Sequence, residues 1–389
     1  MMTSGRSCSV AVSVCVLIGV GACLDAVGPP PLAGKDATVL WRVPGIAAVG
    51  APALDDSSVF VFDTLGVLRA FARRTGQPRW QRTITTEGTY RGIGAAAGTV
   101  VLSAGSLVGI DAVTGTERWR IPNRGVSPMA LNDSLIAVSG LGLFGELAAL
   151  SASNGLERWR TSVWPTDSVA PFDRDANFKT PAFSTESVVA SFEVRRSQPV
   201  LRGGIARFDP RTGIRRWTTM LPVTNNLLLT TPSAAAVGGG SVAVSAFDGF
   251  VYVFDESSGA SRWTGGPLQV AGRVVLTNGD DRPVAIAGQF VVVGSIFGYL
   301  NVHNVQTGQL TWSVFTQLGP VREILPVGQG LVLAGHYGGG LALLELATGA
   351  IRWRLTPLAD IDRVDGMRVV GDTVFATSLA GGLSVFRLP

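Results

Sequence analysis

Short apolar runs punctuated by glycine dominate the hydrophobic pattern of this chain. The runs are four to seven residues long and rich in Val, Leu and Ala, as in Val59-Phe60-Val61-Phe62. This is the length of a β-strand. A short turn over 64–66 follows that run, and a second apolar run covers 67–71. After residue 23, no apolar stretch of 18 or more residues is free of Gly, Pro, charged or amide side chains. The pattern therefore predicts many short strands and no membrane-spanning helix in this part of the chain.

Tryptophan recurs along the chain in a repeat. Eight of the nine tryptophans are separated by 39, 39, 40, 58, 46, 49 and 41 residues: Trp41, Trp80, Trp119, Trp159, Trp217, Trp263, Trp312 and Trp353. Each of the last seven follows a glycine by four residues, as Trp119 follows Gly115. Shortly before this glycine stands an Asp, Asn or Ser whose side chain can accept hydrogen bonds from the turn (Asp111, Ser151, Asp209, Asp255 and Asn304). Such regularity indicates one supersecondary unit repeated along the chain.

Each unit contains the signals for four strands. Two apolar runs and the tryptophan segment account for three of them, and a Pro-initiated segment ahead of several units, as at Pro52 and Pro128, accounts for the fourth. Four short strands per repeat are typical of a propeller blade. Trp41 lacks a preceding hairpin, and the strands after Trp353 lack a closing tryptophan. We therefore predict an all-β fold over 38–389. It is an eight-bladed β-propeller of four-stranded antiparallel blades, closed by pairing of the N- and C-terminal strands.

The first 22 residues are predicted to be an export signal. Arg6 provides a positive start, and the apolar segment over 9–20 is too short to span a bilayer comfortably. It ends in Val20-Gly21-Ala22-Cys23, which resembles a bacterial lipobox and predicts lipidation of Cys23. Residues 23–37 then form a tether that is stiffened by three consecutive prolines. The alternative is an ordinary signal peptide in which Cys23 is incidental.

Composition narrows the functional classes. An apolar content of 46% excludes intrinsic disorder. The net charge of +4 comes from 30 Arg and two Lys, with no basic cluster longer than two residues, so nucleic-acid binding has little support. The three cysteines all lie within the first 23 residues, which predicts a mature chain without a disulfide. His303 and His336 are the only histidines, too few for a histidine-based metal site or triad, and we expect structural roles for both.

The repeat resembles a known one. Segments such as GIDAVTGTERW and RFDPRTGIRRW follow an A-x-D-x-x-T-G-x-x-x-W pattern, which is similar to the tryptophan-docking motif of the pyrroloquinoline quinone (PQQ) repeat superfamily. The resemblance covers about 38–389. It implies that each indole packs between neighbouring blades, so the eight repeat tryptophans have a structural role. The arginine that precedes six of the later tryptophans is expected to lie on the opposite, solvated face of the strand.

Two functional classes within that superfamily compete. The quinoprotein dehydrogenases bind PQQ and Ca²⁺, and several carry a vicinal disulfide. This chain has no Cys after position 23 and no recognisable set of Ca²⁺ ligands, so no cofactor, metal or enzymatic activity is predicted. The BamB-type lipoproteins of outer-membrane assembly are the closer resemblance, through length, lipobox, tether, eight blades and ring closure.

This resemblance implies a monomeric scaffold, anchored by lipid to the periplasmic face of the outer membrane, with the β-barrel assembly machinery as partner. Leu24 after the cysteine favours the outer membrane, and retention at the inner membrane stays open. The alternative is an envelope propeller that binds another protein or a polysaccharide.

Candidate partner contacts fall in two segments. The family carries acidic residues just upstream of a Thr-Thr-Pro segment, which resembles 230–232 here, but this chain has Leu227, Leu228 and Leu229 in their place. The second segment is a long insertion over 161–178 that contains the ninth tryptophan, Trp164. Long loops in a compact repeat often bind a partner. Trp164 either packs under its own loop or anchors such a partner.

Overall fold

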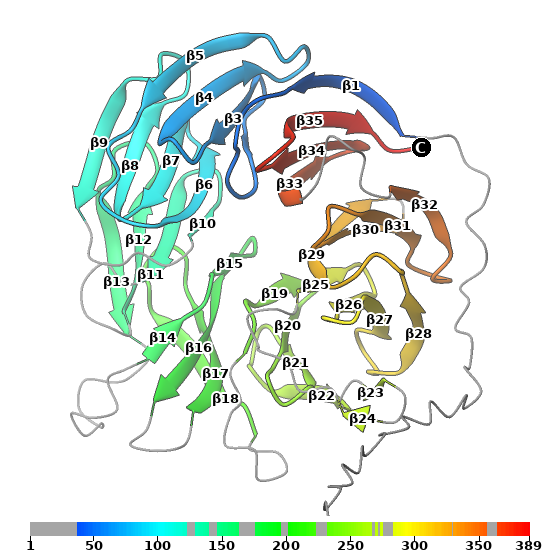
Figure 1. The fold of residues 1–389 in the computed structure, drawn as a ribbon. Coiled ribbons are helices and arrows are strands. Elements are labelled where there is room, and N and C mark those ends of the chain that lie inside the picture. Colours follow the sequence, from blue (N-terminus) through cyan, green and yellow to red (C-terminus); the bar gives the residue numbers. More distant parts are fainter. Residues whose placement is uncertain are drawn as a thin grey trace, which may run out of the picture.

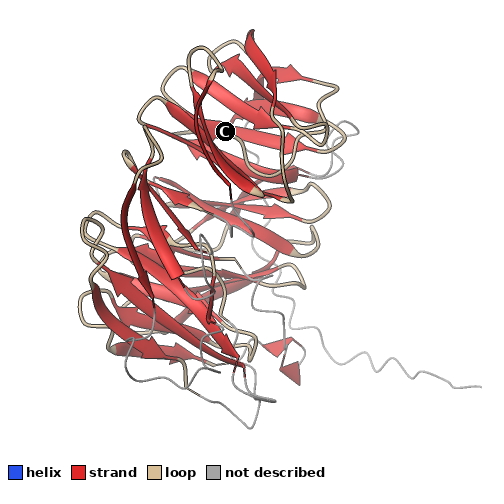
Figure 2. Ribbon diagram, turned by 90° about the vertical axis from the view of Figure 1, so that its left-hand side faces the viewer, coloured by secondary structure: helices blue, strands red, loops and turns tan. Residues whose placement is uncertain are grey.

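The structure is a computed structural model. It describes residues 37–122, 129–139, 146–162, 176–195, 201–222, 232–266, 269–270, 273–274, 283–328, 330–355 and 364–389. The described residues form strands and turns (Figure 2). No helix within these ranges has the length and apolarity needed to cross a membrane.

Eight antiparallel sheets stand around one axis as the blades of a propeller (Figure 1). Blades 1 to 4 follow the chain from the inside outward. Blade 1 consists of β2 (Ala53–Leu54), β3 (Ser58–Phe62), β4 (Val67–Ala72) and β5 (Pro78–Thr83). Blade 2 consists of β6 (Tyr90–Ala96), β7 (Thr99–Ala104), β8 (Ser106–Asp111) and β9 (Glu117–Pro122). Blade 3 consists of β10 (Ala130–Leu131), β11 (Leu135–Ser139), β12 (Glu146–Ser151) and β13 (Glu157–Ser162). In blade 4, β14 (Ala176–Phe178) and β15 (Ala182–Phe183) both pair with β16 (Val188–Arg195), followed by β17 (Leu201–Phe208) and β18 (Arg215–Met220).

Blades 5 to 8 repeat this arrangement. Blade 5 consists of β19 (Ala236–Gly238), β20 (Ser241–Ser245), β21 (Val251–Asp255) and β22 (Ser261–Gly265). A two-stranded ribbon of β23 (Gln269–Val270) and β24 (Arg273–Val274) follows it. Blade 6 consists of β25 (Val284–Ala287), β26 (Phe290–Gly294), β27 (Tyr299–Asn304) and β28 (Leu310–Phe315). Blade 7 consists of β29 (Val321–Gly328), β30 (Leu331–His336), β31 (Leu341–Glu345) and β32 (Ile351–Leu355). Blade 8 consists of β33 (Val364–Val370), β34 (Thr373–Ser378), β35 (Gly382–Arg387) and β1 (Thr38–Val43).

Blade 8 is shared between the two ends of the chain. Its outer strand β1 pairs antiparallel with β35, with Thr38 opposite Arg387 and Val43 opposite Leu383. Figure 1 shows these first and last strands side by side. This pairing confirms the predicted ring closure, which leaves no gap between the first and last blades.

The hydrophobic core is divided among the contacts between blades. The buried apolar residues form eight clusters, and each cluster joins two neighbouring blades around the ring. Because both faces of a blade are covered, its middle strands are mostly apolar and buried on both faces; all five residues of β3 are buried. The outer strands are exposed by comparison, as in β5.

Candidate functional site

The repeat tryptophans occupy the contacts between blades. Seven of the eight donate the indole N–H to a backbone carbonyl in the turn between the third and fourth strands of the next blade, at 2.8–3.2 Å. The pairs are Trp41 with Arg73, Trp80 with Ala112, Trp119 with Ala152, Trp159 with Pro210, Trp217 with Glu256, Trp263 with Val305 and Trp312 with Leu346.

The glycine of each receiving turn lies directly under the indole. Gly213 has a φ of +69°, and a Cβ at this position would lie 2.6 Å from the ring of Trp159. Glycine is therefore required here both by the backbone conformation and by the close approach of the ring. The tryptophan four residues after each glycine lies in the outer strand that this turn leads into. Each glycine receives the tryptophan of the preceding blade, while its own tryptophan contacts the following one.

Trp353 differs because of the ring closure. The third and fourth strands of blade 8 are β35 and β1, which come from opposite ends of the chain, so no turn joins them to receive this indole. Trp353 instead packs against Phe386, with ring centroids 6.0 Å apart, in a cluster that also contains Leu388 and Ala37.

The arginines before the tryptophans are bound more tightly than the sequence suggested. In blades 2, 4, 5 and 7 the arginine pairs with an acidic residue seven positions earlier, at 2.5–3.0 Å: Arg118 with Asp111, Arg216 with Asp209, Arg262 with Asp255 and Arg352 with Glu345. These four arginines are ion-paired as well as solvated, with side chains 21–51% exposed. The pairing was missed because a spacing of seven does not by itself bring two side chains together. Here the turn does so by folding one strand back on the other.

The aspartates have a second function in the same turns. Oδ1 of Asp111 accepts hydrogen bonds from the backbone N–H groups of Val113 and Thr114, at 2.9 and 2.7 Å. The Thr114 hydrogen bond and the Arg118 guanidinium lower the pKa of Asp111 to about 2. Arg216 and the turn amides likewise hold the pKa of Asp209 below its usual range, and Arg262 does the same for Asp255.

These lowered pKa values predict that the folded state loses stability in acid. A carboxylate whose pKa is lower in the folded state stabilises the fold fully above its unfolded pKa, and this contribution is lost as the pH falls through the folded pKa. We expect the urea midpoint of the wild type to fall between about pH 4 and pH 2. In the variant D111N/D209N/D255N the amide oxygen still accepts the turn N–H bonds, but the fall should be shallower. Equal slopes for both proteins would contradict the prediction.

The residues predicted to bind the membrane or a partner lie outside the described residues: Cys23, Trp164, Leu227, Leu228 and Leu229. The histidines are described. His303 stacks on Trp263 with centroids 5.6 Å apart, and its Nδ1 lies 3.1 Å from the carbonyl oxygen of Gly308. His336 is buried, with Nδ1 2.8 Å from the carbonyl oxygen of Gly319. Burial lowers the pKa of both imidazoles.

A network of charged side chains joins the inner strands of blades 7 and 8. Arg322 near the start of β29 lies 3.3 Å from Oδ1 of Asp365 near the start of β33. Its guanidinium also stacks over Tyr337, 5.3 Å from the ring centroid. The other carboxylate oxygen of Asp365 accepts the backbone N–H of Leu379 at 2.9 Å. These contacts hold the two blades in register at one end of the central axis.

A second acid–base pair continues this network. Oε2 of Glu323 accepts the backbone N–H of Met367 at 3.1 Å, and Oε1 lies 3.7 Å from Arg368. Burial raises the pKa of Glu323, and the neighbouring Arg368 opposes that rise. Neither pair can be predicted from the sequence, because its members are more than 40 residues apart.

The same end of the propeller exposes apolar side chains. We call it face A: the face on which the first strand of each blade begins and the turn between second and third strands lies. In four consecutive blades this turn carries an exposed large side chain: Phe297 in blade 6 (47% exposed), Tyr337 in blade 7 (39%), Leu379 in blade 8 (38%) and Leu65 in blade 1 (77%). Aromatic side chains are enriched in protein-binding surfaces, and Phe297 and Tyr337 are two such side chains on face A.

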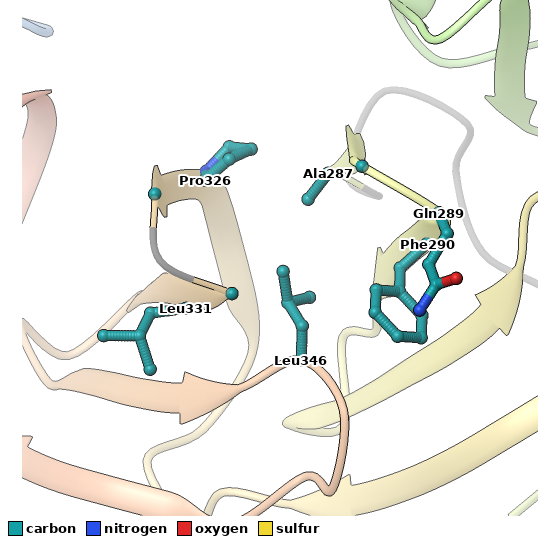
Figure 3. Close-up of a pocket in the computed structure, with 9 residues that line it drawn as sticks. Ala287, Gln289, Phe290, Pro326, Leu331 and Leu346 are labelled. Atoms are coloured by element: carbon teal, nitrogen blue, oxygen red, sulfur yellow. The ribbon is translucent and has the colours of Figure 1, made fainter.

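A small apolar pocket lies on the opposite face, which we call face B. Its volume is about 310 Å³, and it lies between blades 6 and 7, lined by Ala287, Phe290, Pro326, Leu331, Leu346 and neighbouring glycines. Figure 3 shows Leu346 projecting between Ala287 and Pro326. The lining offers few polar groups, so the pocket suits an apolar side chain.

The acidic side chains near the central axis are engaged in contacts between blades. No group of three or more His, Cys, Asp or Glu side chains within the described ranges is placed to hold a metal ion. Glu323 and Asp365 near the axis already bind an arginine and a backbone N–H each. A Ca²⁺ ion requires six to eight oxygen ligands, and these carboxylates are committed elsewhere.

Comparison with known proteins places the chain within the PQQ-repeat superfamily. A family model described as outer membrane protein assembly factor BamB matches residues 103–297 and 297–388. The match covers more than half of the chain, so the chain belongs to the BamB family of PQQ-repeat propellers.

Individual relatives are more distant. The chain is 27% identical over 188 residues to the outer membrane protein assembly factor BamB of Burkholderia pseudomallei, which covers 46% of this chain and 44% of the relative. The chain thus spans less than half the length of the curated relatives it matches.

Solved structures agree on the fold. The crystal structure of BamB from Moraxella catarrhalis has a TM-score of 0.67 at 16% identity, covering 91% of this chain and all of the other. A quinohemoprotein alcohol dehydrogenase from Pseudomonas putida also has a TM-score of 0.67, at 15% identity, covering 92% of this chain and 78% of the other. At these identities the similarity establishes the propeller fold alone.

Proposed function

We propose that this protein is a non-enzymatic scaffold, anchored by a lipid on Cys23 to the periplasmic face of the outer membrane, that takes part in assembling outer-membrane proteins. The observation that supports this most is the BamB family match over residues 103–297 and 297–388.

Face A is the surface we assign to the partner. Its exposed side chains on blades 6, 7, 8 and 1 are carried by short turns between paired strands. The Arg322–Asp365 pair holds Tyr337 and Leu379 in place from below. Because the ring is closed, turns of neighbouring blades keep fixed distances from one another. Side chains from several blades can therefore form one docking surface.

Photo-crosslinking in cells tests the proposal. A photo-reactive amino acid at position 337 on face A is expected to capture components of the barrel-assembly machinery. The matched control carries it at position 113, which is also exposed (77%) but lies in a turn on face B. Recovery of the folded, acylated protein without any barrel-assembly component at position 337 would count against the proposed function.

A further inference from the structure

The turn between the third and fourth strands of blade 3 lacks a carboxylate that the equivalent turns of blades 2, 4 and 5 contain. In those blades the first residue of the turn is Asp111, Asp209 or Asp255. Oδ1 of each aspartate accepts the backbone N–H groups two and three positions later, at 2.7–3.0 Å, and Oδ2 pairs with the arginine before the tryptophan. In blade 3 the residue is Ser151, whose hydroxyl instead forms a hydrogen bond with the hydroxyl of Ser153.

Arg158, the arginine before Trp159, lacks a second partner as well. In blades 2 and 5 the arginine also donates to a hydroxyl on the second strand, opposite the turn aspartate, at 2.8 Å: Arg118 to Thr99 and Arg262 to Ser241. The residue opposite Ser151 is Leu135, which has no hydroxyl. Within the described part of the chain, no ion pair or hydrogen bond holds the Arg158 guanidinium, whereas each of the other five arginines before a repeat tryptophan has such a partner.

Arg158 and Ser151 line a second pocket on face B. Its volume is about 400 Å³, and Pro210 and Arg211 from the equivalent turn of blade 4 line it too. Arg158 and Arg211 are both exposed, so a solute can reach their guanidinium groups. The pocket therefore combines two positive charges with the hydroxyl groups of Ser151 and Ser153.

The acidic residues closest to these arginines in the sequence do not line this pocket. Asp209 accepts the backbone N–H of Arg211 and pairs with Arg216. Glu157 pairs with Arg160, and Asp133 lines a neighbouring pocket. The described lining thus carries positive charge without a carboxylate to balance it.

We propose that this pocket binds a phosphate group, in the place that the aspartate carboxylate occupies in blades 2, 4 and 5. Its oxygens would accept the N–H groups of Ser153 and Asn154, which are equivalent to the two that Asp111 accepts, and the guanidinium N–H groups of Arg158. Successive backbone N–H groups in a turn form an anion-binding concavity. A planar guanidinium also matches the geometry of phosphate oxygens.

Phosphate suits the pocket better than a single carboxylate for two reasons. Arg211 provides a second positive charge, and a phosphate group offers three terminal oxygens to two N–H groups and two guanidinium groups. The pocket is also larger than a phosphate group alone, and Leu135 and Pro210 provide apolar surface for the rest of a ligand. A soluble phosphate ester and the headgroup of a phospholipid share this chemistry.

Calorimetric titration of the full-length protein in detergent with inorganic phosphate tests the site. The titration is made at about pH 8, where phosphate carries about two negative charges, with the ionic strength held constant by sodium chloride. We expect saturable binding to the wild type. Arg158→Gln should weaken binding about tenfold or more, because it removes charge-assisted hydrogen bonds.

Ser151→Asp is the most informative variant, because it restores the internal carboxylate. The fold accommodates aspartate at this position in blades 2, 4 and 5, and the new carboxylate would occupy the place of the phosphate. We expect phosphate binding to be lost and the thermal midpoint in phosphate-free buffer to rise. Added phosphate should raise the midpoint of the wild type and leave that of this variant unchanged, since only a ligand that binds the folded state stabilises it.

Leu156→Asp is the matched control. It adds the same charge to the same turn, at a position that is 63% exposed and does not line the pocket. Because solvent and salt screen an exposed charge, this variant should bind phosphate within about twofold of the wild type. Equal loss of binding in Ser151→Asp and Leu156→Asp would overturn the inference, and so would the absence of saturable binding to the wild type.

A second titration distinguishes the two sources of phosphate. Glycerol phosphate and a short-chain phosphatidylglycerol below its micelle concentration are each added to the Cys23→Ala protein, which needs no detergent if the anchor is lost. Binding of the lipid that Ser151→Asp abolishes would assign the pocket to a headgroup, and binding of glycerol phosphate alone would assign it to a soluble ester. Binding of neither would overturn the proposal. The site lies on face B and assumes nothing about outer-membrane protein assembly, so its failure leaves the crosslinking test at position 337 unaffected.

Discussion

Replacing Trp159 by alanine is expected to lower the free energy of unfolding by about 3–5 kcal/mol, the usual cost of removing a buried large aromatic side chain. The side chain is only 7% exposed and lies in the cluster between blades 3 and 4. Its removal leaves a cavity and also an unpaired carbonyl at Pro210, which accepts the indole N–H at 2.9 Å. Urea denaturation followed by circular dichroism measures the change. A loss below about 1 kcal/mol would show that the docking is dispensable.

A double-mutant cycle with Gly213 tests the docking geometry itself. Gly213→Ala alone should be strongly destabilising, because the new Cβ would lie 2.6 Å from the indole and because φ is +69°. In the Trp159→Ala background the clash disappears and only the backbone cost of about 1–2 kcal/mol remains. The two effects should therefore be less than additive. Strict additivity would mean that the glycine is required for the turn alone.

Replacing Cys23 by alanine is expected to move the protein from the membrane fraction to the soluble fraction almost completely. The physical reason is that several acyl chains on one residue anchor a protein stably, whereas an exported chain without them has only weak surface contacts with the bilayer. Fractionation of cells followed by immunoblotting measures the distribution, and incorporation of labelled palmitate shows acylation directly.

Cys15→Ala is the matched control for the anchor. Cys15 lies within the apolar segment over 9–20, ahead of the predicted cleavage site, so its replacement should leave both export and membrane attachment unchanged. Retention of the Cys23→Ala protein in the membrane, with normal export, would contradict the lipid anchor and favour the reading in which Cys23 is incidental.

The fold could be predicted because its determinants are local and repeated. A strand, an Asx-type turn and a glycine before tryptophan are all encoded within about ten residues, and seven copies reinforce one another. Even ring closure followed from two incomplete repeats at the ends of the chain, and the pairing of β1 with β35 confirms it. The side-chain oxygens of four turn residues accept backbone N–H groups as predicted: Asp111, Asp209, Asp255 and Asn304. The Ser151 hydroxyl instead forms a hydrogen bond with the hydroxyl of Ser153.

The candidate site was harder to predict because its members come from different blades. Arg322 and Asp365 are 43 positions apart, and nothing in either local segment distinguishes their charges from solvated ones. The candidate partner contacts Trp164 and Leu227 to Leu229 lie in segments outside the described residues.

The sequence by itself thus determined the kind of protein: a repeat of four-stranded units, their number, the role of glycine before each tryptophan, and the closure of the ring. The tertiary structure decided which surfaces are available. It brought Phe297, Tyr337, Leu379 and Leu65 to one face and paired the charges of blades 7 and 8. The reason is physical: strands and turns form from neighbouring residues, whereas contacts between blades exist only once the ring has closed.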